Sequence, residues 1–237
     1  MAAVAALTAI GVAHADDTVK ARERMVAEIA ATAREVAPTT GRPALDARVM
    51  EVMGRVPRHL FVPPVVRKYA YENRPLPIGA GQTISQPFIV ALMTDLARVR
   101  PDSKVLEVGT GSGYQAAVLA ELCRAVYTIE IVASLGNEAA ARLRGLGYRN
   151  VEVRIGDGYA GWPERAPFDA IVVTAGADHI PAPLVAQLAP RGRMIIPVGP
   201  SSVESDLMVV EKQADGSVRT HAVLPVAFVP LMRGPPR

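Results

Sequence analysis

The segment that decides the fold class is Lys104-Val105-Leu106-Glu107-Val108-Gly109-Thr110-Gly111-Ser112-Gly113. Its first half is a short, mostly apolar run typical of a buried strand, and its second half is a glycine-rich turn. The residues that follow, 114–123, have the composition of a helix. A strand, a glycine-rich turn and a helix form the first half of a nucleotide-binding α/β unit. The segment therefore predicts a nucleotide site where the strand ends.

The chain beyond this segment continues the same alternation. We expect further strands at residues 126–131, 151–155, 170–174 and 194–198, with helices at 134–146 and 181–188. Short apolar strands separated by helices predict a parallel sheet with helices on both faces. Two later runs, 207–211 and 218–228, predict antiparallel strands at one edge. We therefore expect a doubly wound, Rossmann-like α/β fold with a mostly parallel sheet and antiparallel C-terminal strands.

The N-terminal part of the chain is predicted to be helical. Apolar residues recur at helical spacing in residues 18–36, 44–56 and 87–99. Gly79-Ala80-Gly81 predicts a turn or a flexible loop. We divide the chain into an N-terminal helical extension, residues 1–40, and a single domain, residues 41–237.

The composition excludes several classes of protein. Half of the 237 residues are hydrophobic, which excludes disorder for most of the chain. Cys123 is the only cysteine, which excludes a disulfide scaffold. No apolar stretch reaches the roughly 18–20 residues that span a bilayer, so we expect no membrane segment. The net charge is only +3 and the basic residues are scattered among acids, so we expect no nucleic-acid partner.

The spacing of the glycines distinguishes between nucleotide cofactors. A dinucleotide fingerprint G-x-G-x-x-G that starts at Gly109 requires glycine at position 114, where the chain has Tyr114. The observed G-x-G-x-G, with Glu107 in the preceding strand, is the form found in class I S-adenosylmethionine-dependent methyltransferases.

Two more acidic residues stand at the ends of consecutive predicted strands. Glu130 closes the second strand, where a carboxylate can accept two hydrogen bonds from a ribose diol. Asp157 follows the third strand, where an adenine amino group could be met. Ligands of open parallel sheets bind beyond the carboxyl ends of the strands. The glycine-rich loop and the two acids together predict a site for an adenosine-containing cofactor.

Several segments carry a family resemblance. They are Val56-Pro57-Arg58-His59-Leu60-Phe61-Val62-Pro63, Leu76-Pro77-Ile78-Gly79, Gly81-Gln82-Thr83-Ile84-Ser85-Gln86-Pro87, Gly156-Asp157-Gly158, Ala166-Pro167-Phe168-Asp169-Ala170-Ile171 and Pro197-Val198-Gly199. Through them, and through the glycine-rich loop, the sequence resembles the bacterial protein-L-isoaspartate O-methyltransferases from about residue 42 to residue 234. The segment from Gly81 to Pro87 narrows the family, because the glycine-rich loop alone indicates only a methyltransferase.

The resemblance implies a reaction and its partners. A methyl group passes from S-adenosylmethionine to the free α-carboxylate of an L-isoaspartyl residue in a damaged protein, leaving S-adenosylhomocysteine. The ester then cyclises to a succinimide, and hydrolysis returns part of it to normal aspartate. The implied partners are isoaspartyl-containing proteins and peptides, and we expect the enzyme to be a monomer.

The resemblance also implies the site residues. Ser85 matches the active-site serine of the family, and Thr83 and Ile84 lie beside it in the loop that covers the cofactor. Glu130 matches the ribose-binding acid. The other implied cofactor contacts are Asp157 and Gly158 on the adenine side, and Glu107, Gly109, Thr110, Gly111, Ser112 and Gly113. Val90 and Met232 depart from patterns seen in other members, so no contacts are carried over to these two positions.

The residues agree with this chemistry without help from the family. A carboxylate acceptor is already ionised at pH 7 and needs no general base, and the chain has only four histidines and no recognisable catalytic triad or metal-ligand spacing. We therefore expect no metal, and Ser85 holds the acceptor rather than acting as a nucleophile. Two alternatives stay open: a methyltransferase for another carboxylate, and a non-catalytic nucleotide-sensing domain of the same fold.

The first fifteen residues bear on the location of the protein. They are small and apolar and end in Ala13-His14-Ala15, which resembles a secretory cleavage site, although no basic residue precedes Lys20. An export signal and an uncleaved extension fit this segment about equally. Because S-adenosylmethionine is a cytosolic metabolite, we expect a cytoplasmic enzyme, with a periplasmic form as the alternative.

Overall fold

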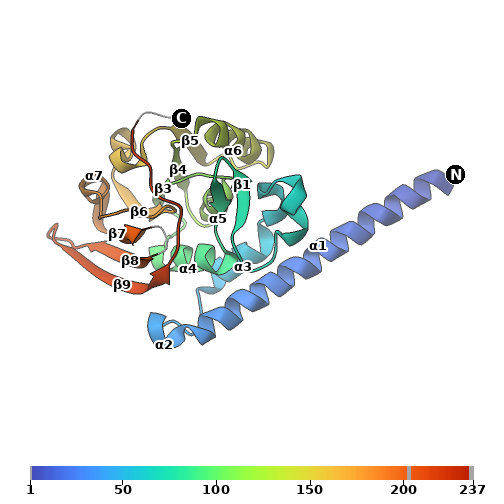
Figure 1. The fold of residues 1–237 in the computed structure, drawn as a ribbon, viewed down its shortest axis with the longest axis horizontal. Coiled ribbons are helices and arrows are strands. Elements are labelled where there is room, and N and C mark those ends of the chain that lie inside the picture. The colour runs from blue at the N-terminus through green and yellow to red at the C-terminus, as the bar shows by residue number, and fades with distance from the viewer. Residues whose placement is uncertain (1, 202–203, 235–237) are drawn as a thin grey trace.

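A seven-stranded sheet forms the centre of the protein (Figure 1). The computed structural model describes residues 2–201 and 204–234, and within these ranges the side chains from Asp17 onward. The strand order is β5-β4-β3-β6-β7-β8-β9; β3 to β7 run parallel, and β8 and β9 are antiparallel. The strands are β3 (Lys104–Val108), β4 (Ala125–Glu130), β5 (Val151–Ile155), β6 (Phe168–Val173), β7 (Leu188–Ser201), β8 (Glu204–Lys212) and β9 (Val218–Val226).

Helices cover both faces of the sheet, and the strands alternate their side chains between two cores. Along β3, Val105 packs in a large core with side chains of α1, α3, α4 and α5, whereas Leu106 and Val108 pack in a second core with Leu184 of α7. This alternation is the two-residue period of a strand buried on both faces. The helices are α1 (Ala2–Glu35), α2 (Ala37–Thr40), α3 (Ala47–Arg55), α4 (Pro87–Ala97), α5 (Tyr114–Ala120), α6 (Ala133–Gly145) and α7 (Ala182–Ala186).

The expected fold is confirmed, with differences at particular strands. β7 is longer than predicted because its ends pair with different neighbours: Leu188 pairs with Phe168 of β6, and Ser201 pairs with Glu204 of β8. A hairpin of β1 (Leu76–Gly79) and β2 (Gln82–Ile84) stands where the sequence predicts only a turn or loop. Strands this short show no usable alternation of apolar residues, so only their turn could be predicted.

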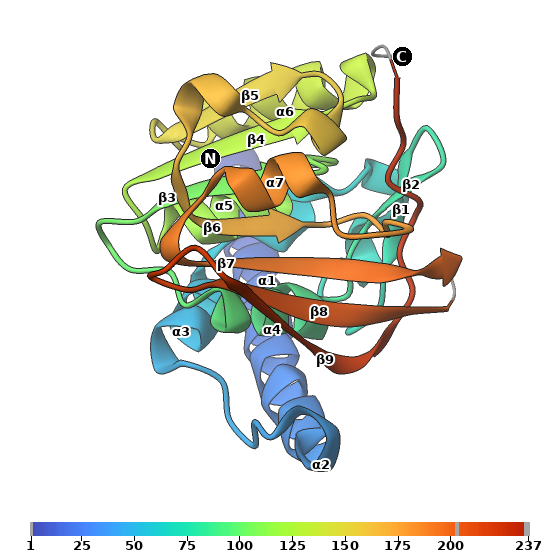
Figure 2. The same ribbon diagram turned by 90° about the vertical axis from the view of Figure 1, so that its left-hand side faces the viewer.

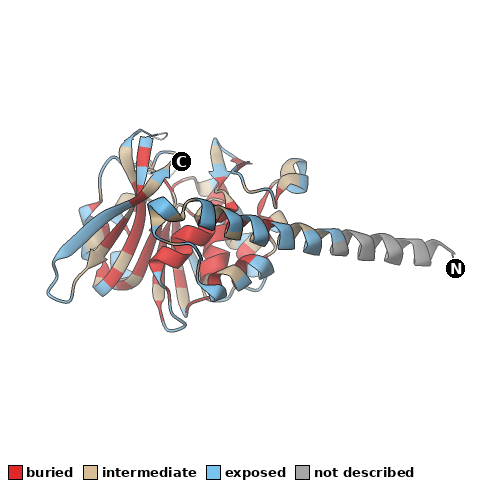
Figure 3. Cartoon of the chain, turned by 90° about the horizontal axis from the view of Figure 1, so that it is seen from below, coloured by how far each residue is buried: buried red, intermediate tan, exposed pale blue. Residues whose placement is uncertain are grey.

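The described part of α1 belongs to the main core. Met25, Ile29 and Ala33 recur every four residues and are at most 1% exposed. The residues between them on the helix surface are mostly exposed or partly buried, and Figure 3 shows this outer side of α1 in pale blue and tan. The boundary at residue 40 between extension and domain stays a prediction, and the signal-like residues 1–15 lie outside the described side chains.

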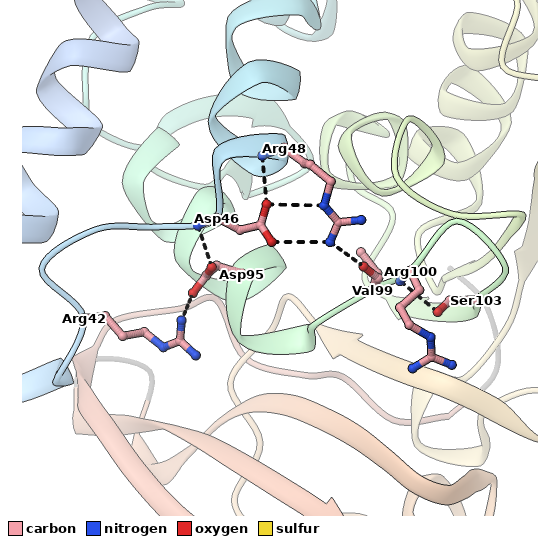
Figure 4. A network of polar contacts seen from close by, with 7 residues as sticks. All are labelled: Arg42, Asp46, Arg48, Asp95, Val99, Arg100 and Ser103. Carbon is pink, nitrogen blue, oxygen red and sulfur yellow. Dashed lines mark hydrogen bonds and ion pairs between the residues drawn. The ribbon is translucent and has the colours of Figure 1, made fainter.

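A polar network fixes the start of α3 to the end of α4 (Figure 4). The Asp46 carboxylate caps α3 by accepting a hydrogen bond from the backbone N–H of Arg48 (2.8 Å). Asp95 of α4 accepts one from the backbone N–H of Asp46 (2.8 Å) and pairs with Arg42. Arg48 Nη2 also donates to the carbonyl of Val99 (3.3 Å). The segment between α2 and α3 is thus anchored to the C-terminal end of α4. The N-terminal end of α4 lies next to the site described below.

Candidate active site

A cavity lies at the carboxyl ends of the parallel strands, where β3 has β4 on one side and β6 on the other. It has a volume of about 720 Å³, counting its open mouth. An open parallel sheet binds its ligand at such a point, because successive strands there leave in opposite directions. The structure brings most of the predicted site residues to its lining, namely Thr83, Ile84, Ser85, Glu107, Gly109, Thr110, Gly111, Ser112, Glu130 and Gly158.

The glycine-rich loop is shaped by its own packing. Gly109, Gly111 and Gly113 have φ angles of 98°, 51° and 88°, in the left-handed region that favours glycine. A Cβ atom on Gly109 would lie 2.5 Å from Thr174 Oγ1, the hydroxyl that donates to the Gly109 carbonyl (2.6 Å). Thr174, which follows β6, therefore ties this loop to the neighbouring strand.

Arg142 holds the same loop from α6. Its Nη1 donates a hydrogen bond to the carbonyl of Ser112 (2.8 Å). In the sequence this arginine looks like part of a solvated helix face, and only the packing of α6 beside the loop shows its second role. Ser112 and Thr110 are both largely buried at the cavity wall.

The Glu130 carboxylate is oriented by two backbone N–H groups. Oε2 accepts from Gly111 (2.7 Å) and Oε1 accepts from Val132 (2.9 Å). Each carboxylate oxygen has two lone pairs, so both oxygens can accept one hydrogen bond more. Glu130 thus offers a fixed pair of acceptors to a diol.

Glu107 is fully buried in β3 and has one oxygen without a partner. Thr128 Oγ1 donates to Oε2, while Oε1 has no hydrogen-bond partner. Burial, which outweighs the hydrogen bond from Thr128 and is helped by the nearby Glu130 charge, raises the pKa of Glu107 to about 8. Gln115, on the first turns of α5, also has a buried and unpartnered acceptor, Oε1. Both side chains line the cavity, so a ligand with N–H donors would satisfy them.

Ser85 lies in the loop between β2 and α4, and a buried arginine holds its backbone. Arg58 is 0% exposed and donates from Nη2 to the Ser85 carbonyl (2.7 Å) and from Nε to the Ala70 carbonyl (2.8 Å). Its guanidinium lies 4.8 Å from the ring centre of Tyr114. Burial lowers the pKa of Arg58 to about 10, so the side chain keeps its charge at neutral pH.

Two predicted residues lie outside the cavity lining. Gly113 faces α6, where an added Cβ would come within 3.1 Å of Leu143. Asp157 uses both carboxylate oxygens on backbone groups: Oδ1 accepts from Tyr159 (2.9 Å) and Oδ2 accepts from Gly234 (3.0 Å). The predicted adenine contact of Asp157 stays a prediction.

The C-terminal segment forms one wall of the cavity. Residues 229–232 line it, and the Leu231 N–H donates to the Gly176 carbonyl (2.7 Å). With the bond from Gly234 to Asp157, these contacts lay the segment across the sheet end, beside the β1–β2 hairpin (Figure 2). Met232 and Val90, to which no contacts were carried over, both line the cavity.

The other reactive side chains of the part of the chain that the structure describes do not gather into a second centre. Within the described residues there is no group of three His, Cys, Asp or Glu placed to hold a metal ion. Cys123 is buried, and burial raises the pKa of its thiol to about 12. His59 Nδ1 lies 2.7 Å from Tyr71 Oη, and burial lowers the pKa of His59. None of the described helices is long and apolar enough to cross a membrane.

Comparison with known sequences identifies the family. Residues 39–235 match the sequence model of protein-L-isoaspartate(D-aspartate) O-methyltransferase (PCMT). The chain belongs to this family. A curated relative, protein-L-isoaspartate O-methyltransferase 2 of Syntrophobacter fumaroxidans, is 62% identical over 231 residues, which is 98% of this methyltransferase and 93% of the relative.

Solved structures of the same family share the fold of this methyltransferase. One protein-L-isoaspartate O-methyltransferase superposes with a TM-score of 0.76 at 27% identity, covering 91% of this chain and 67% of that chain. A Plasmodium falciparum protein assigned to the family, solved in complex with S-adenosyl-L-homocysteine, gives a TM-score of 0.72 at 24% identity, covering 92% and 99%. Both similarities confirm the Rossmann-like fold.

Proposed function

We propose that this methyltransferase transfers the methyl group of S-adenosylmethionine to the free α-carboxylate of L-isoaspartyl residues in damaged proteins, and that Ser85 positions the acceptor. Membership of the family supports the reaction and the cofactor. The role of Ser85 rests on one observation about where it lies. Thr83, Ser85, Thr174, Val229 and Pro230 line two adjoining spaces.

The first of these spaces is the cavity at the strand ends, and the second is a groove that opens from it. We call the second space the outer groove; besides the five shared residues, it is lined by Thr32, Val36, Pro75, Gln86, Phe88, Ile89 and residues 224–228. A transfer reaction needs donor and acceptor to meet in one alignment. Ser85 stands where the two spaces join, which suits a group that holds the acceptor against the donor.

The residues of the cavity fit the cofactor. Glu130 offers paired acceptors for the ribose diol, and the unpartnered oxygens of Glu107 and Gln115 suit the ammonium group of the methionyl end. The loop at Gly109 and Gly111 brings backbone close to the ligand. When bound, S-adenosylmethionine supplies an electrophilic methyl group on a sulfonium. The protein keeps the surrounding side chains in place and excludes water.

The acceptor needs little chemical help from the protein. An α-carboxylate is ionised at neutral pH, so no base is required. A serine hydroxyl can donate a hydrogen bond to it and fix its distance. We assign this task to Ser85, whose backbone is held by Arg58. Alignment then distinguishes an isoaspartyl residue, whose carboxylate sits beside the main chain, from aspartate, whose carboxylate is one carbon out on a side chain.

A pair of peptides tests the proposal. One contains L-isoaspartate and its twin contains L-aspartate, and the assay follows methyl transfer from labelled S-adenosylmethionine. We expect methylation of the isoaspartyl peptide and almost none of the twin, because a misplacement of about 1 Å can cost on the order of a hundredfold in rate. Equal rates would point to a methyltransferase for carboxylates in general, and binding without transfer to either would point to a nucleotide-sensing domain.

The remaining parts of the proposal concern partners and location. We infer a monomer without a nucleic-acid partner, working in the cytoplasm. The scattered charge supports the absence of a nucleic-acid partner, and the use of a cytosolic methyl donor supports the location. Size-exclusion chromatography with light scattering measures the oligomeric state directly.

A further inference from the structure

The outer groove has an unusual chemical character for a surface feature. Not one of the described residues that line it carries a charge. Its polar groups are hydroxyls and one amide, and the rest is apolar, including Val36, Ile89 and Leu224. Burying an unpaired charge in such a place is costly, whereas an apolar side chain gains about 25 cal/mol for each Å² removed from water. The groove therefore favours neutral side chains.

The position of the outer groove, next to the cofactor cavity, indicates what kind of ligand it would bind. Because it shares residues with the cofactor cavity and Ser85 stands at the junction, an acceptor held at Ser85 must extend its neighbouring residues somewhere. The groove is the space continuous with that point. On the function proposed above, a substrate bound with its isoaspartyl carboxylate at Ser85 would lay the neighbouring stretch of its chain in this groove.

One wall of this groove comes from α1 and the residue after it, which lie before the part of the chain that matches the family model. Thr32 and Val36 provide this wall. Its place is fixed from behind, because Met25, Ile29 and Ala33 of the same helix are buried in the main core. The wall is thus part of the rigid body of the protein.

Hydrogen bonds tie this wall to the loop that carries Ser85. Asn73 Nδ2 donates to Thr32 Oγ1 (3.1 Å), and Asn73 Oδ1 accepts from the backbone N–H of Phe88 (3.0 Å). Phe88 stands in the first turn of α4, three residues after Ser85. Asn73 therefore sets the distance between the α1 wall and the point where the acceptor carboxylate is held.

We propose that Thr32 and Val36 determine substrate specificity: they form a subsite that takes a neutral, preferably apolar, side chain flanking the isoaspartyl residue. Val36 is the better residue to test: like Thr32 it is partly buried, but its side chain makes no hydrogen bond, whereas the Thr32 hydroxyl accepts one from Asn73. A charge placed there would face the flanking side chain of the substrate. Peptides whose flanking residue carries the opposite charge would then be methylated faster.

The test uses isoaspartyl peptides that differ only in the flanking residues, with Leu, Glu or Lys placed on each side in turn. For the unaltered protein we expect kcat/KM to be about tenfold higher with Leu than with either charged residue on the side that enters the groove. Val36→Lys should remove this preference over Glu, and Val36→Glu should remove it over Lys. Val65→Lys, on the exposed face of the segment Pro64–Tyr69, is the matched control and should change neither ratio.

The outcomes separate this inference from the proposed function. If isoaspartyl peptides are methylated but the ratios are the same in the Val36 variants and the unaltered protein, the subsite is overturned and the function stands. If no isoaspartyl peptide is methylated, both fail. Calorimetry with S-adenosylmethionine accompanies each variant, and an unchanged dissociation constant shows that the protein is folded and its cofactor cavity intact. The two Val36 variants of opposite charge must shift the preference in opposite directions for the subsite to hold.

Discussion

Ser85 illustrates how a single position can serve two spaces. Its carbonyl is fixed by Arg58, and its location at the junction of cavity and groove leaves the hydroxyl to the acceptor in our proposal. Ser85→Ala should lower kcat by roughly 10- to 100-fold, the equivalent of about 1.5–3 kcal/mol for a hydrogen bond to a charged group. The dissociation constant of S-adenosylmethionine should stay nearly unchanged. Ser217→Ala, in the turn before β9, is the control.

Full turnover in the Ser85→Ala variant would remove the residue from the reaction but leave the family assignment in place. A variant that loses cofactor affinity as well as turnover would move Ser85 from the acceptor to the donor.

Glu130 should contribute to cofactor affinity directly. Glu130→Ala removes two charged acceptors and is expected to weaken S-adenosylmethionine binding by roughly 2–3 kcal/mol. Part of that loss comes from the loop, since the Gly111 and Val132 N–H groups lose their partner. Titration calorimetry measures it, with exposed Glu51→Ala on α3, away from the cavity, as control. An unchanged dissociation constant would exclude Glu130 from the site.

Glu107 should make stability depend on pH in the direction opposite to most acids. Its folded pKa of about 8 lies above the ordinary value near 4.5, so between these pH values the folded protein holds a proton that the unfolded chain has lost. The free energy of unfolding without cofactor should therefore fall as pH rises from 4.5 to 8, by at most about 5 kcal/mol.

Urea unfolding at pH 5, 6.5 and 8 measures this effect against Glu107→Gln. The variant keeps an acceptor for Thr128 but cannot ionise. The stability of the unaltered protein minus that of the variant should decrease across this range. A constant difference would contradict the raised pKa.

The strands at the centre of the sheet can be predicted from the local sequence pattern, whereas the elements that cover the site cannot. β3 is predicted with its observed bounds because a short, fully buried strand is an apolar run with a glycine-rich stop. The same logic places Gly109, Gly111 and Glu130 at the site. The β1–β2 hairpin could not be predicted, because its strands are too short to show an alternation of apolar residues. The C-terminal wall could not be predicted either, because Leu231 is held at the cavity by a hydrogen bond to Gly176, which is distant in sequence.

Arg58 shows a similar limit. Its sequence context marks a family motif, yet its partners, the carbonyls of Ala70 and Ser85, belong to other segments. Arg58→Met should reduce stability by about 2–4 kcal/mol, since each buried carbonyl left unpaired costs about 1–2 kcal/mol. It should also lower kcat more than it raises the dissociation constant of S-adenosylmethionine. Chemical denaturation and steady-state kinetics together check both effects; loss of stability with normal kcat would mean that Arg58 only supports the fold.

At the scale of the whole molecule, the N-terminal helix α1 should contribute much of the stability. Deleting residues 1–36 should destabilise the protein severely, because Met25 and Ile29 alone each bury a side chain worth about 1.5–3 kcal/mol. Typical domains have only about 5–15 kcal/mol of stability. Deleting residues 1–15 keeps this core and is expected to leave the melting temperature within a few degrees. Equal melting temperatures for both deletions would show that α1 is dispensable.

This result bears on location, because a form that starts at Asp16 would keep Met25, Ile29 and Ala33, the buried apolar residues in the described part of α1. Fractionation of the native host with N-terminal sequencing decides between the two locations. We expect the protein in the cytoplasmic fraction; a periplasmic form beginning at Asp16 would overturn that expectation.

The wall built by residues 229–232 has a consequence for synthesis. A ribosome makes the chain from the N-terminus, so the strands from β3 to β9 emerge before this wall does. A growing chain can therefore assemble its sheet while the cofactor pocket still lacks one side. Cofactor binding can therefore stabilise only a nearly complete chain. We expect a chain truncated before residue 229 to form its central sheet but to have no methyltransferase activity.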